Sequence, residues 1–267
     1  MENKMRDVLI TGAYGGMGRE TALLLRSCGF RVFALDVRVG ECEENIIPIK
    51  TDLTSEESVA SAFDTVRGYT DSLFAIIHFA GIYMLDSLVE ISNESFRKIF
   101  DVNLHGAFLV NKFFVPMLSR GSRIIITTSE LAPLAPLPFT GIYAVTKGAL
   151  DKYAFSLCME LQLIGIAVSV IRAGAVKTEM LGDSTDALDS FCKSTSLYTC
   201  NAERFKSIVD SVESRCIPPE KIAKKVTRVL GKKKPAFAYS INRNPLLLIL
   251  NLLPKRMQLW IIRCVLR

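Results

Sequence analysis

The chain has 267 residues, of which 49% are hydrophobic, and a formal net charge of +6. This length and apolar content suit one α/β domain with a buried core and exclude a disordered chain. The basic residues are dispersed, apart from residues 232–234 and a basic C-terminal tail, and they do not alternate with aromatic residues. We therefore predict no nucleic-acid partner. Seven scattered cysteines without a C-x-x-C pair and only two histidines argue against a metal site and for a reducing compartment.

Two apolar segments bear on location. Residues 8–10 form a strand-like run near the start, which leaves no room for a secretory leader, so we expect a cytoplasmic protein. The apolar run at 245–253 is shorter than the about 20 residues that span a bilayer. Any membrane contact by this run would therefore be at the surface.

Strand-like and helix-like segments alternate along the chain, which is typical of a parallel sheet with helices on both faces. Strands are predicted near 7–11, 31–36, 46–49, 73–79, 122–128, 166–172 and 235–239, and helices near 17–28, 55–67, 93–118, 143–164 and 219–230. No repeat or linker interrupts this order. The pattern predicts an α/β fold with a Rossmann-type doubly wound parallel sheet, as a single catalytic domain over 1–240 with a C-terminal amphipathic helical extension over 241–267.

The segment at about 178–217 has no clear hydrophobic period and is rich in Ser, Thr, Asp and Cys. It follows the sixth predicted strand, at the edge of the sheet where ligands bind. A long segment without an obvious element is usually functional, so we expect a substrate loop here.

A glycine-rich segment, residues 11–18, follows the first predicted strand and opens the first helix. Glycines at Gly12, Gly16 and Gly18 let the backbone turn tightly and approach a pyrophosphate, which the positive helix N-terminus then binds. The segment therefore predicts a dinucleotide site.

Asp36 ends the second predicted strand, 18 residues beyond Gly18. A carboxylate at this place can accept hydrogen bonds from both hydroxyls of an adenosine ribose. A 2′-phosphate would bring further negative charge against it, which favours NAD. Arg38 and Arg19 could each reach a phosphate, so NADP stays open as the cofactor.

Tyr143 and Lys147 are four residues apart on a predicted helix, so their Cβ atoms should lie about 5–6 Å apart on one face. A free tyrosine has a pKa near 10, and a nearby cation must lower it by roughly 2–3 units to make the phenol useful near neutral pH. The pair predicts a general acid/base.

In this order and spacing, the motifs resemble those of the short-chain dehydrogenase/reductase family, and of its hydroxysteroid and retinol dehydrogenase-like members in particular. The resemblance covers roughly 7–235 and is carried by the loop at 11–18 with Asp52, Leu53, Ala80, Gly81, Asn103, Ser129, Tyr143, Lys147 and Thr178.

The resemblance implies four catalytic residues. Tyr143 would be the general acid/base, and Ser129 would hydrogen-bond the substrate oxygen. Lys147 would bind the nicotinamide ribose and lower the pKa of Tyr143. Asn103 would break the long helix and hold a water that links Lys147 to solvent.

It also implies a set of cofactor-binding residues, in which Asp52 meets the adenine ring and Thr178 the nicotinamide carboxamide. The full set is Gly12, Tyr14, Gly16, Met17, Gly18, Asp36, Asp52, Leu53, Ala80, Gly81, Asn103, Tyr143, Lys147, Gly174, Val176 and Thr178.

The chain departs from the family's pattern at three places. His78 and Phe79 stand where the family usually has two asparagines, and we expect His78 to be a core residue. The interval from Ser129 to Tyr143 is one residue longer than usual, which would put Glu130 in the serine's position. An ionised carboxylate cannot donate a hydrogen bond, so we keep Ser129. Gly174 follows an alanine instead of a proline and is expected to preserve a close approach to the cofactor.

The first hypothesis is an oxidoreductase that moves a hydride between NAD(H) and a secondary alcohol or ketone. A reductase of an acyl, retinoid or sugar carbonyl, or a dinucleotide-binding sensor without catalysis, are the alternatives. The sensor is disfavoured because the catalytic set is present, and a sugar-nucleotide epimerase because few residues follow Thr178.

Apolar residues at the expected pocket favour a bulky apolar substrate such as a steroid or bile acid. They lie in the proline-rich loop 131–139, at 83–85 and in the C-terminal segment, where leucines at helical spacing alternate with basic residues. The C-terminal helices could pack on the domain or a second subunit, cover an apolar substrate, or contact an anionic membrane surface. The family resemblance further implies a homodimer or homotetramer built through the helices near 93–118 and 143–164.

Overall fold

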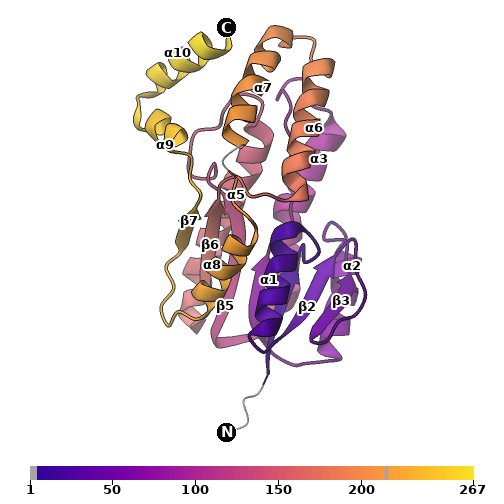
Figure 1. Ribbon diagram of the computed structural model, residues 1–267. Helices are drawn as coiled ribbons and strands as arrows, with labels where there is room; N and C mark the ends of the chain where they lie inside the picture. Colours follow the sequence, from indigo (N-terminus) through magenta and orange to yellow (C-terminus); the bar gives the residue numbers. More distant parts are fainter. Residues whose placement is uncertain (1–4, 214–215) are drawn as a thin grey trace.

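The computed structural model describes residues 5–213 and 216–267, and only the backbone for 180–186 and 210–213. Seven parallel strands form one sheet in the order β3-β2-β1-β4-β5-β6-β7 (Figure 1). They are β1 (Arg6–Thr11), β2 (Phe30–Asp36), β3 (Ile46–Lys50), β4 (Leu73–His78), β5 (Leu118–Ser129), β6 (Ala167–Ala173) and β7 (Ala238–Ile241). The predicted doubly wound parallel sheet in a single domain is confirmed. The last strand lies a few residues later than its predicted position at 235–239.

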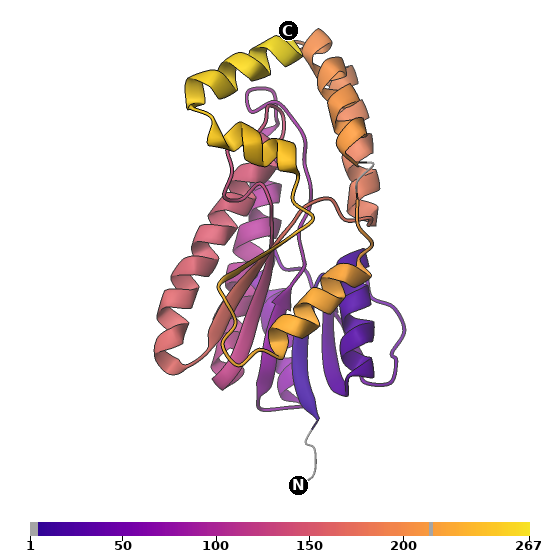
Figure 2. The same cartoon turned by 60° about the vertical axis from the view of Figure 1, so that its left-hand side comes forward.

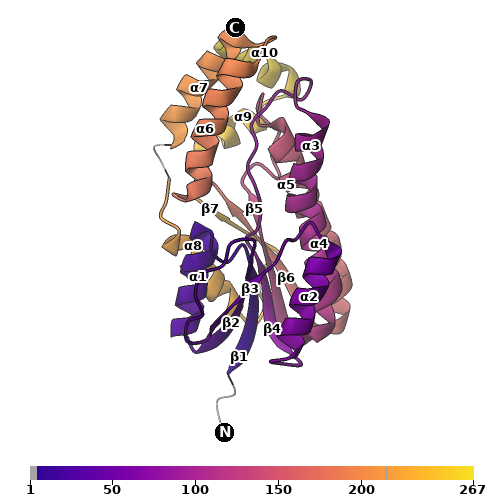
Figure 3. The same ribbon diagram turned by 90° about the vertical axis from the view of Figure 1, so that its right-hand side faces the viewer.

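Helices cover both faces of the sheet (Figure 3). On one face lie α1 (Gly16–Ser27) and α8 (Glu220–Leu230), and on the other lie α2 (Glu56–Arg67), α4 (Gly106–Phe114) and α5 (Gly141–Leu161). Leu25 of α1 and Val226 of α8 are fully buried in one apolar layer, while Phe114 of α4 and Leu150 of α5 are buried in the other. Burial on both faces explains why the strands read as continuous apolar runs.

The segment predicted as one helix over 93–118 is divided. It begins as α3 (Asn93–Phe100), where the Ser92 hydroxyl accepts a hydrogen bond from the Ser95 N–H at 3.0 Å. A π-helical turn (Asp101–His105) contains Asn103, and α4 is followed by a 3₁₀ turn (Val115–Met117) before β5. Such π turns frequently mark functional positions in helices.

The predicted substrate loop at 178–217 contains two helices, α6 (Glu179–Ser194) and α7 (Thr199–Glu213). The expectation of a segment without elements was wrong. Ser, Thr and Asp have weak helix propensity, and only short pairs of apolar residues mark the buried face. Leu188 and Phe191 on α6, and Ala202 and Phe205 on α7, are buried at a spacing of three residues, so tertiary packing stabilises the pair.

After β7 the chain forms α9 (Pro245–Leu252) and α10 (Lys255–Leu266). These helices lie at the same end of the molecule as α6 and α7 (Figure 2). Asn244 begins α9, because its side-chain oxygen accepts a hydrogen bond from the Leu246 N–H at 2.9 Å. Within the described residues, every helix is too short or too polar to traverse a lipid bilayer.

Candidate active site

A cleft of about 720 Å³ opens where β1 and β4 end side by side. This is the point at which the strand order reverses direction, the usual ligand site of such sheets. Gly12, which follows β1, has a φ of +66°, and a Cβ there would lie 2.6 Å from the Ala80 backbone nitrogen. Only glycine lets the two loops approach this closely.

The rest of the glycine loop is shaped by equally close contacts. A Cβ at Gly18 would overlap the Gly12 carbonyl oxygen, and one at Gly16 would lie 2.8 Å from the Thr178 methyl carbon. Helix α1 begins at Gly16, so its free backbone N–H groups face the cleft. The loop and the cleft volume therefore fit a dinucleotide with its pyrophosphate at the helix N-terminus.

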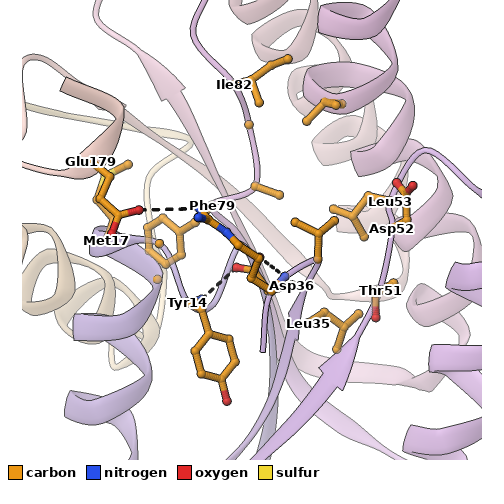
Figure 4. Close-up of a pocket in the computed structure, with 18 of the residues that line it drawn as sticks. Tyr14, Met17, Leu35, Asp36, Thr51, Asp52, Leu53, Phe79, Ile82 and Glu179 are labelled. Carbon is orange, nitrogen blue, oxygen red and sulfur yellow. Dashed lines mark hydrogen bonds and ion pairs between the residues drawn. The ribbon is translucent and has the colours of Figure 1, made fainter. Parts of the chain in front are cut away.

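Asp36 is fixed at the rim of the cleft by backbone donors (Figure 4). Its carboxylate accepts hydrogen bonds from the Tyr14 N–H at 2.9 Å and the Arg38 N–H at 3.2 Å. The Tyr14 ring points away from Ile82 at the opposite side of the cleft. Tyr14 thus contributes its backbone N–H to the site, while its ring points away from the opposite wall of the cleft.

The two arginines that could meet a 2′-phosphate have different partners. Arg19 is ion-paired with Glu43, which also accepts a hydrogen bond from Arg26 at 2.8 Å. Arg38 reaches across the cleft to Glu179 at 3.6 Å, and its side chain is 86% exposed. Because exposed ion pairs of this length are weak, Arg38 is held less firmly by its partner than Arg19 is.

Asp52 and Leu53 form the far wall (Figure 4). The Asp52 carboxylate accepts hydrogen bonds from the Thr54 N–H at 2.9 Å and the Thr54 hydroxyl at 2.7 Å. Leu53 is buried and contributes an apolar side chain to this wall.

The three reactive side chains come from two neighbouring elements. Ser129 ends β5, and Tyr143 and Lys147 lie one turn apart on α5. Ser129 and Tyr143 are joined by a side-chain hydrogen bond. The Lys147 ammonium lies 5.8 Å from the centre of the Tyr143 ring. The predicted serine, tyrosine and lysine therefore meet in one place.

Burial acts on both ionisable groups of this triad. It raises the pKa of Tyr143 to about 12, although the hydrogen bond with Ser129 opposes the rise. It lowers the pKa of Lys147 to about 8. The expected fall of the Tyr143 pKa is therefore wrong for the protein alone, since desolvation of the phenolate outweighs the hydrogen bond with Ser129.

Because Gly81 has no side chain, it leaves room for the side chains of Lys147 and Asn103. A Cβ at Gly81 would lie 3.0 Å from the Lys147 Nζ and 3.1 Å from the Asn103 Oδ1. Asn103 accepts a hydrogen bond from the Ile82 N–H at 2.8 Å and donates to the Ile82 carbonyl at 3.0 Å and the Thr146 hydroxyl at 3.1 Å. Asn103 thus fastens the loop after β4 to α5, and its role in holding a water stays a prediction.

Six predicted residues lie outside the lining of the cleft. Asn103, Tyr143 and Lys147 adjoin the lining residues Gly81 and Tyr83, and Ser129 pairs with Tyr143, whereas the last two residues lie elsewhere. Gly174 and Val176 follow β6, and the atoms that crowd Gly174 are the Asn242 carbonyl, which a Cβ would overlap, and Glu130 Oε1 at 3.1 Å. The need for glycine there comes from the returning C-terminal chain, which sequence reasoning missed. Contact of either residue with a cofactor stays a prediction.

His78 is a core residue, as expected. Its Nε2 lies 3.1 Å from the Asn111 Oδ1, and burial lowers its pKa to about 4. A neutral imidazole paired with an amide has no charge to supply near neutral pH.

Glu130 has a structural role, as a hydrogen-bond acceptor for the C-terminal segment, that sequence reasoning missed. Its Oε2 accepts a hydrogen bond of 2.6 Å from the Asn244 N–H at the start of α9, and burial raises the pKa of its carboxyl group. Glu130 therefore holds the C-terminal segment beside Ser129. The extra residue in the interval before Tyr143 was the available signal.

An apolar cluster lies between Tyr143 and the C-terminal helices. The Tyr83 ring lies 4.8 Å from the Tyr143 ring, and Tyr83 packs on the cluster. Within it, the Phe139 ring lies 4.7 Å from Phe191, and Leu266 of α10 is buried there too. We call this the distal cluster; its buried members are Leu85, Leu188, Phe191, Ala202, Phe205 and Leu266.

The fold and this site define a Rossmann-type protein of the dehydrogenase class. The sequence pattern of the short chain dehydrogenases matches residues 6–189. The chain belongs to the short-chain dehydrogenase family.

Among curated relatives, the chain is 36% identical over 179 residues to the uncharacterized oxidoreductase YbbO of Escherichia coli. It is 33% identical to the NADPH-dependent 1-acyldihydroxyacetone phosphate reductase of Schizosaccharomyces pombe and 32% identical to estradiol 17-beta-dehydrogenase 2 of Mus musculus. These matches cover 65%, 67% and 70% of this chain. They span 66%, 64% and 52% of the relatives' own lengths.

Solved structures share the fold. A short chain dehydrogenase family protein from Francisella tularensis superposes with a TM-score of 0.74 at 24% identity, covering 89% of this chain and 97% of that one. The 3-ketoacyl-(acyl-carrier-protein) reductase from Brucella melitensis, complexed with NADH, gives 0.72 at 19% identity, covering 88% and 96%.

Proposed function

We propose that this protein is an NAD-dependent oxidoreductase acting on a secondary alcohol or the corresponding ketone. The observation that carries the proposal is the meeting of Ser129, Tyr143 and Lys147 beside a cleft with a dinucleotide-binding glycine loop. A sensor without catalysis would not need this triad.

The residues divide the chemistry between them. In the oxidation direction, Tyr143 takes the hydroxyl proton of the substrate while the nicotinamide ring, when bound, accepts the hydride. Ser129 hydrogen-bonds the reacting oxygen and stabilises the charge that develops on it. Lys147, which lies beside Gly81 and 5.8 Å from the centre of the Tyr143 ring, would supply positive charge near the phenol and so oppose the effect of burial on the pKa of Tyr143.

NAD is the proposed cofactor because Asp36 occupies the rim of the cleft where the adenosine ribose would lie. Its carboxylate already binds two backbone N–H groups, so it cannot easily turn away from a 2′-phosphate. The compared proteins differ in their cofactor. The relative from Schizosaccharomyces pombe is named NADPH-dependent, and the structure from Brucella melitensis is a complex with NADH.

The proposed substrate is bulky and apolar, with a steroid or bile acid as the favoured case. The distal cluster adjoins Tyr143 through Tyr83, and it gathers apolar side chains from α6, α7 and α10. A small hydrophilic substrate would gain nothing from such walls. The name of the mouse relative agrees with this class.

We further propose a cytoplasmic homodimer or homotetramer assembled through α4 and α5. These helices expose Phe108, Val145, Phe155 and Met159, each between 42% and 48%. Large apolar side chains on the outer helices are typical of interfaces.

A substrate panel tests the proposal. Steroids, bile acids, acyl compounds and sugars would be compared by following the absorbance of the reduced nicotinamide. Phe139→Ala should raise the KM for a steroid and barely change the KM for a small secondary alcohol, because it removes a ring of the distal cluster. Tyr69→Ala, which removes an exposed ring outside the site, is the matched control. Turnover of sugars but not steroids would reject the substrate class.

A further inference from the structure

The outer surface of α9 is apolar. Leu246, Ile249 and Leu252 recur every three residues, so they share one side of the helix. Their exposed fractions are 63%, 58% and 84%. Exposed leucine and isoleucine side chains at this density are unusual on a soluble surface and indicate a contact.

The outer face of α10 combines an aromatic ring with positive charge. Trp260 is 66% exposed. Arg256 precedes it by four residues and Arg263 follows it by three, so all three lie on one side of the helix. The neighbouring side of α10 packs on the distal cluster through Leu266 and Ile262. The helix therefore has one face for the protein and one for an external partner.

The charged residues of the C-terminal part of the chain are all basic. Residues 221–267 contain twelve Lys and Arg residues and no Asp or Glu, whereas residues 1–220 contain 21 basic and 27 acidic residues. The net positive charge of the protein thus comes from its C-terminal part. Such a segment is complementary to a negatively charged surface.

We propose that α9 and α10 dock the protein on an anionic lipid bilayer. The leucines of α9 would enter the boundary of the acyl chains, Trp260 would lie at the headgroups, and the arginines of α10 would meet lipid phosphates. We name this surface the docking face; it comprises Leu246, Ile249, Leu252, Arg256, Leu259, Trp260, Arg263 and Arg267.

A second copy of the chain fits this surface less well. A two-fold contact places the same patch of both subunits face to face. The contact would then gather Arg256, Arg263 and Arg267 from both subunits, with no acidic residue of 221–267 to neutralise them. A bilayer with anionic headgroups accepts the apolar and the basic side chains together.

The docking face borders an apolar groove of about 480 Å³. Two basic residues of the docking face, Arg263 and Arg267, line this groove together with the apolar residues Leu88, Phe139 and Leu266. Phe139 and Leu266 belong to or contact the distal cluster, which leads toward Tyr143. Docking would set the groove at the lipid surface, where an apolar substrate accumulates; this consequence rests on the proposed function, but docking itself does not.

The chain offers its own probe, because Trp260 is the single tryptophan. Phosphatidylcholine vesicles with and without phosphatidylglycerol would be added to the full-length protein, and Trp260 emission and co-sedimentation measured. We expect a blue shift and co-sedimentation with the anionic vesicles only, both weakened by salt. No nicotinamide or substrate is needed, so the result is independent of the reaction.

A charge-reversed variant sharpens the test. Arg256→Glu/Arg263→Glu should weaken vesicle binding roughly 30-fold or more, since each basic residue near an anionic surface contributes about 1 kcal/mol. Lys50→Glu/Arg67→Glu changes the net charge equally at exposed positions outside the docking face and outside α4 and α5, and should bind normally.

Three outcomes would overturn the proposal. The first is a Trp260 emission that no vesicle alters, together with no co-sedimentation. The second is equal loss of binding in both charge-reversed variants, which would reduce the effect to net charge. The third is a lipid-free blue shift that grows with protein concentration, which would assign the docking face to a second copy.

Discussion

The two halves of the active site are built by different kinds of contact. In the cofactor half, backbone meets backbone: Gly12 lies against Ala80, and Gly18 against the Gly12 carbonyl, with no room for a Cβ. In the substrate half, beyond β6, the helices are joined to the domain by side chains, as where Asn251 accepts a hydrogen bond from the Ala135 N–H at 2.7 Å.

This difference separates two tasks. Binding a dinucleotide requires fixed backbone geometry, which a few glycines at set spacing impose on any member of the fold. Surrounding a substrate requires only apolar surfaces of suitable shape, which many side-chain combinations supply. We therefore expect mutations in the first half to change catalysis as a whole, and mutations in the second half to change it for particular substrates.

The largest effect is expected at Tyr143, the proposed general acid/base, which lies between the two halves. Tyr143→Phe should lower kcat by roughly 10²–10⁴-fold for every substrate, because it removes the proton-transferring hydroxyl. The dissociation constant for NAD, measured by fluorescence titration, should hardly change. Lys147→Ala, by contrast, should harm both kcat and NAD binding. If Tyr143→Phe retained more than about a tenth of the rate, Tyr143 would not be the general acid/base.

The next largest effect is expected at two glycines: Gly18 in the cofactor half, and Gly174 at the backbone contact where the chain after β7 returns to the end of β6. A methyl group at Gly18 would overlap the Gly12 carbonyl, and one at Gly174 would overlap the Asn242 carbonyl. Each alanine variant should lose about 1–3 kcal/mol of unfolding free energy, as overpacked sites do. Gly18→Ala should also weaken NAD binding, whereas Gly174→Ala should mainly raise the KM for bulky substrates. Urea unfolding and steady-state kinetics check both. Equal loss of NAD affinity in the two variants would remove the distinction between the halves.

The same difference explains what sequence alone could predict. The sheet and the glycine loop follow from continuous apolar runs and glycine spacing, which are local signals. The helices α6 and α7 have weak propensity and only paired apolar residues such as Leu188 and Phe191, so their existence depends on tertiary packing.

The site, too, could be predicted only where local sequence signals determine it. Spacing on one helix brings Tyr143 and Lys147 together, but the balance that raises the pKa of Tyr143 depends on burial, which spacing does not reveal. The link from Glu130 to Asn244 joins residues 114 positions apart and leaves only an extra residue in the sequence as its trace.

A smaller effect is expected on the preference for NAD over NADP, which depends on the cofactor half of the site. The unmodified enzyme should prefer NAD over NADP by at least about tenfold in kcat/KM, since a phosphate against Asp36 costs on the order of 1–3 kcal/mol. Asp36→Ala should narrow this gap. Comparable use of both cofactors by the unmodified enzyme would show that Arg38, which is exposed and only weakly paired with Glu179, overrides the carboxylate.

The smallest effect is expected at Glu130, the positioning residue that joins the halves. Glu130→Gln keeps the size of the side chain but replaces a carboxylate acceptor with a neutral one, so the bond to the Asn244 N–H should weaken by about 1 kcal/mol. Because this bond sets where α9 begins, the KM for a bulky substrate should rise several-fold, with kcat for a small alcohol unchanged.

The pH profile distinguishes this positioning role from general loss of structure. Burial raises the pKa of Glu130, so the carboxylate of the unmodified protein takes up its proton at a higher pH than an exposed glutamate would. Protonation leaves a weaker acceptor for the Asn244 N–H, and the KM for a bulky substrate should therefore rise as the pH falls through that pKa. Glu130→Gln cannot titrate and should show this rise already at neutral pH, with a flat profile below it. Glu57→Gln, on the exposed side of α2, should follow the unmodified protein. An identical acid dependence in Glu130→Gln and the unmodified protein would assign the titration to another group.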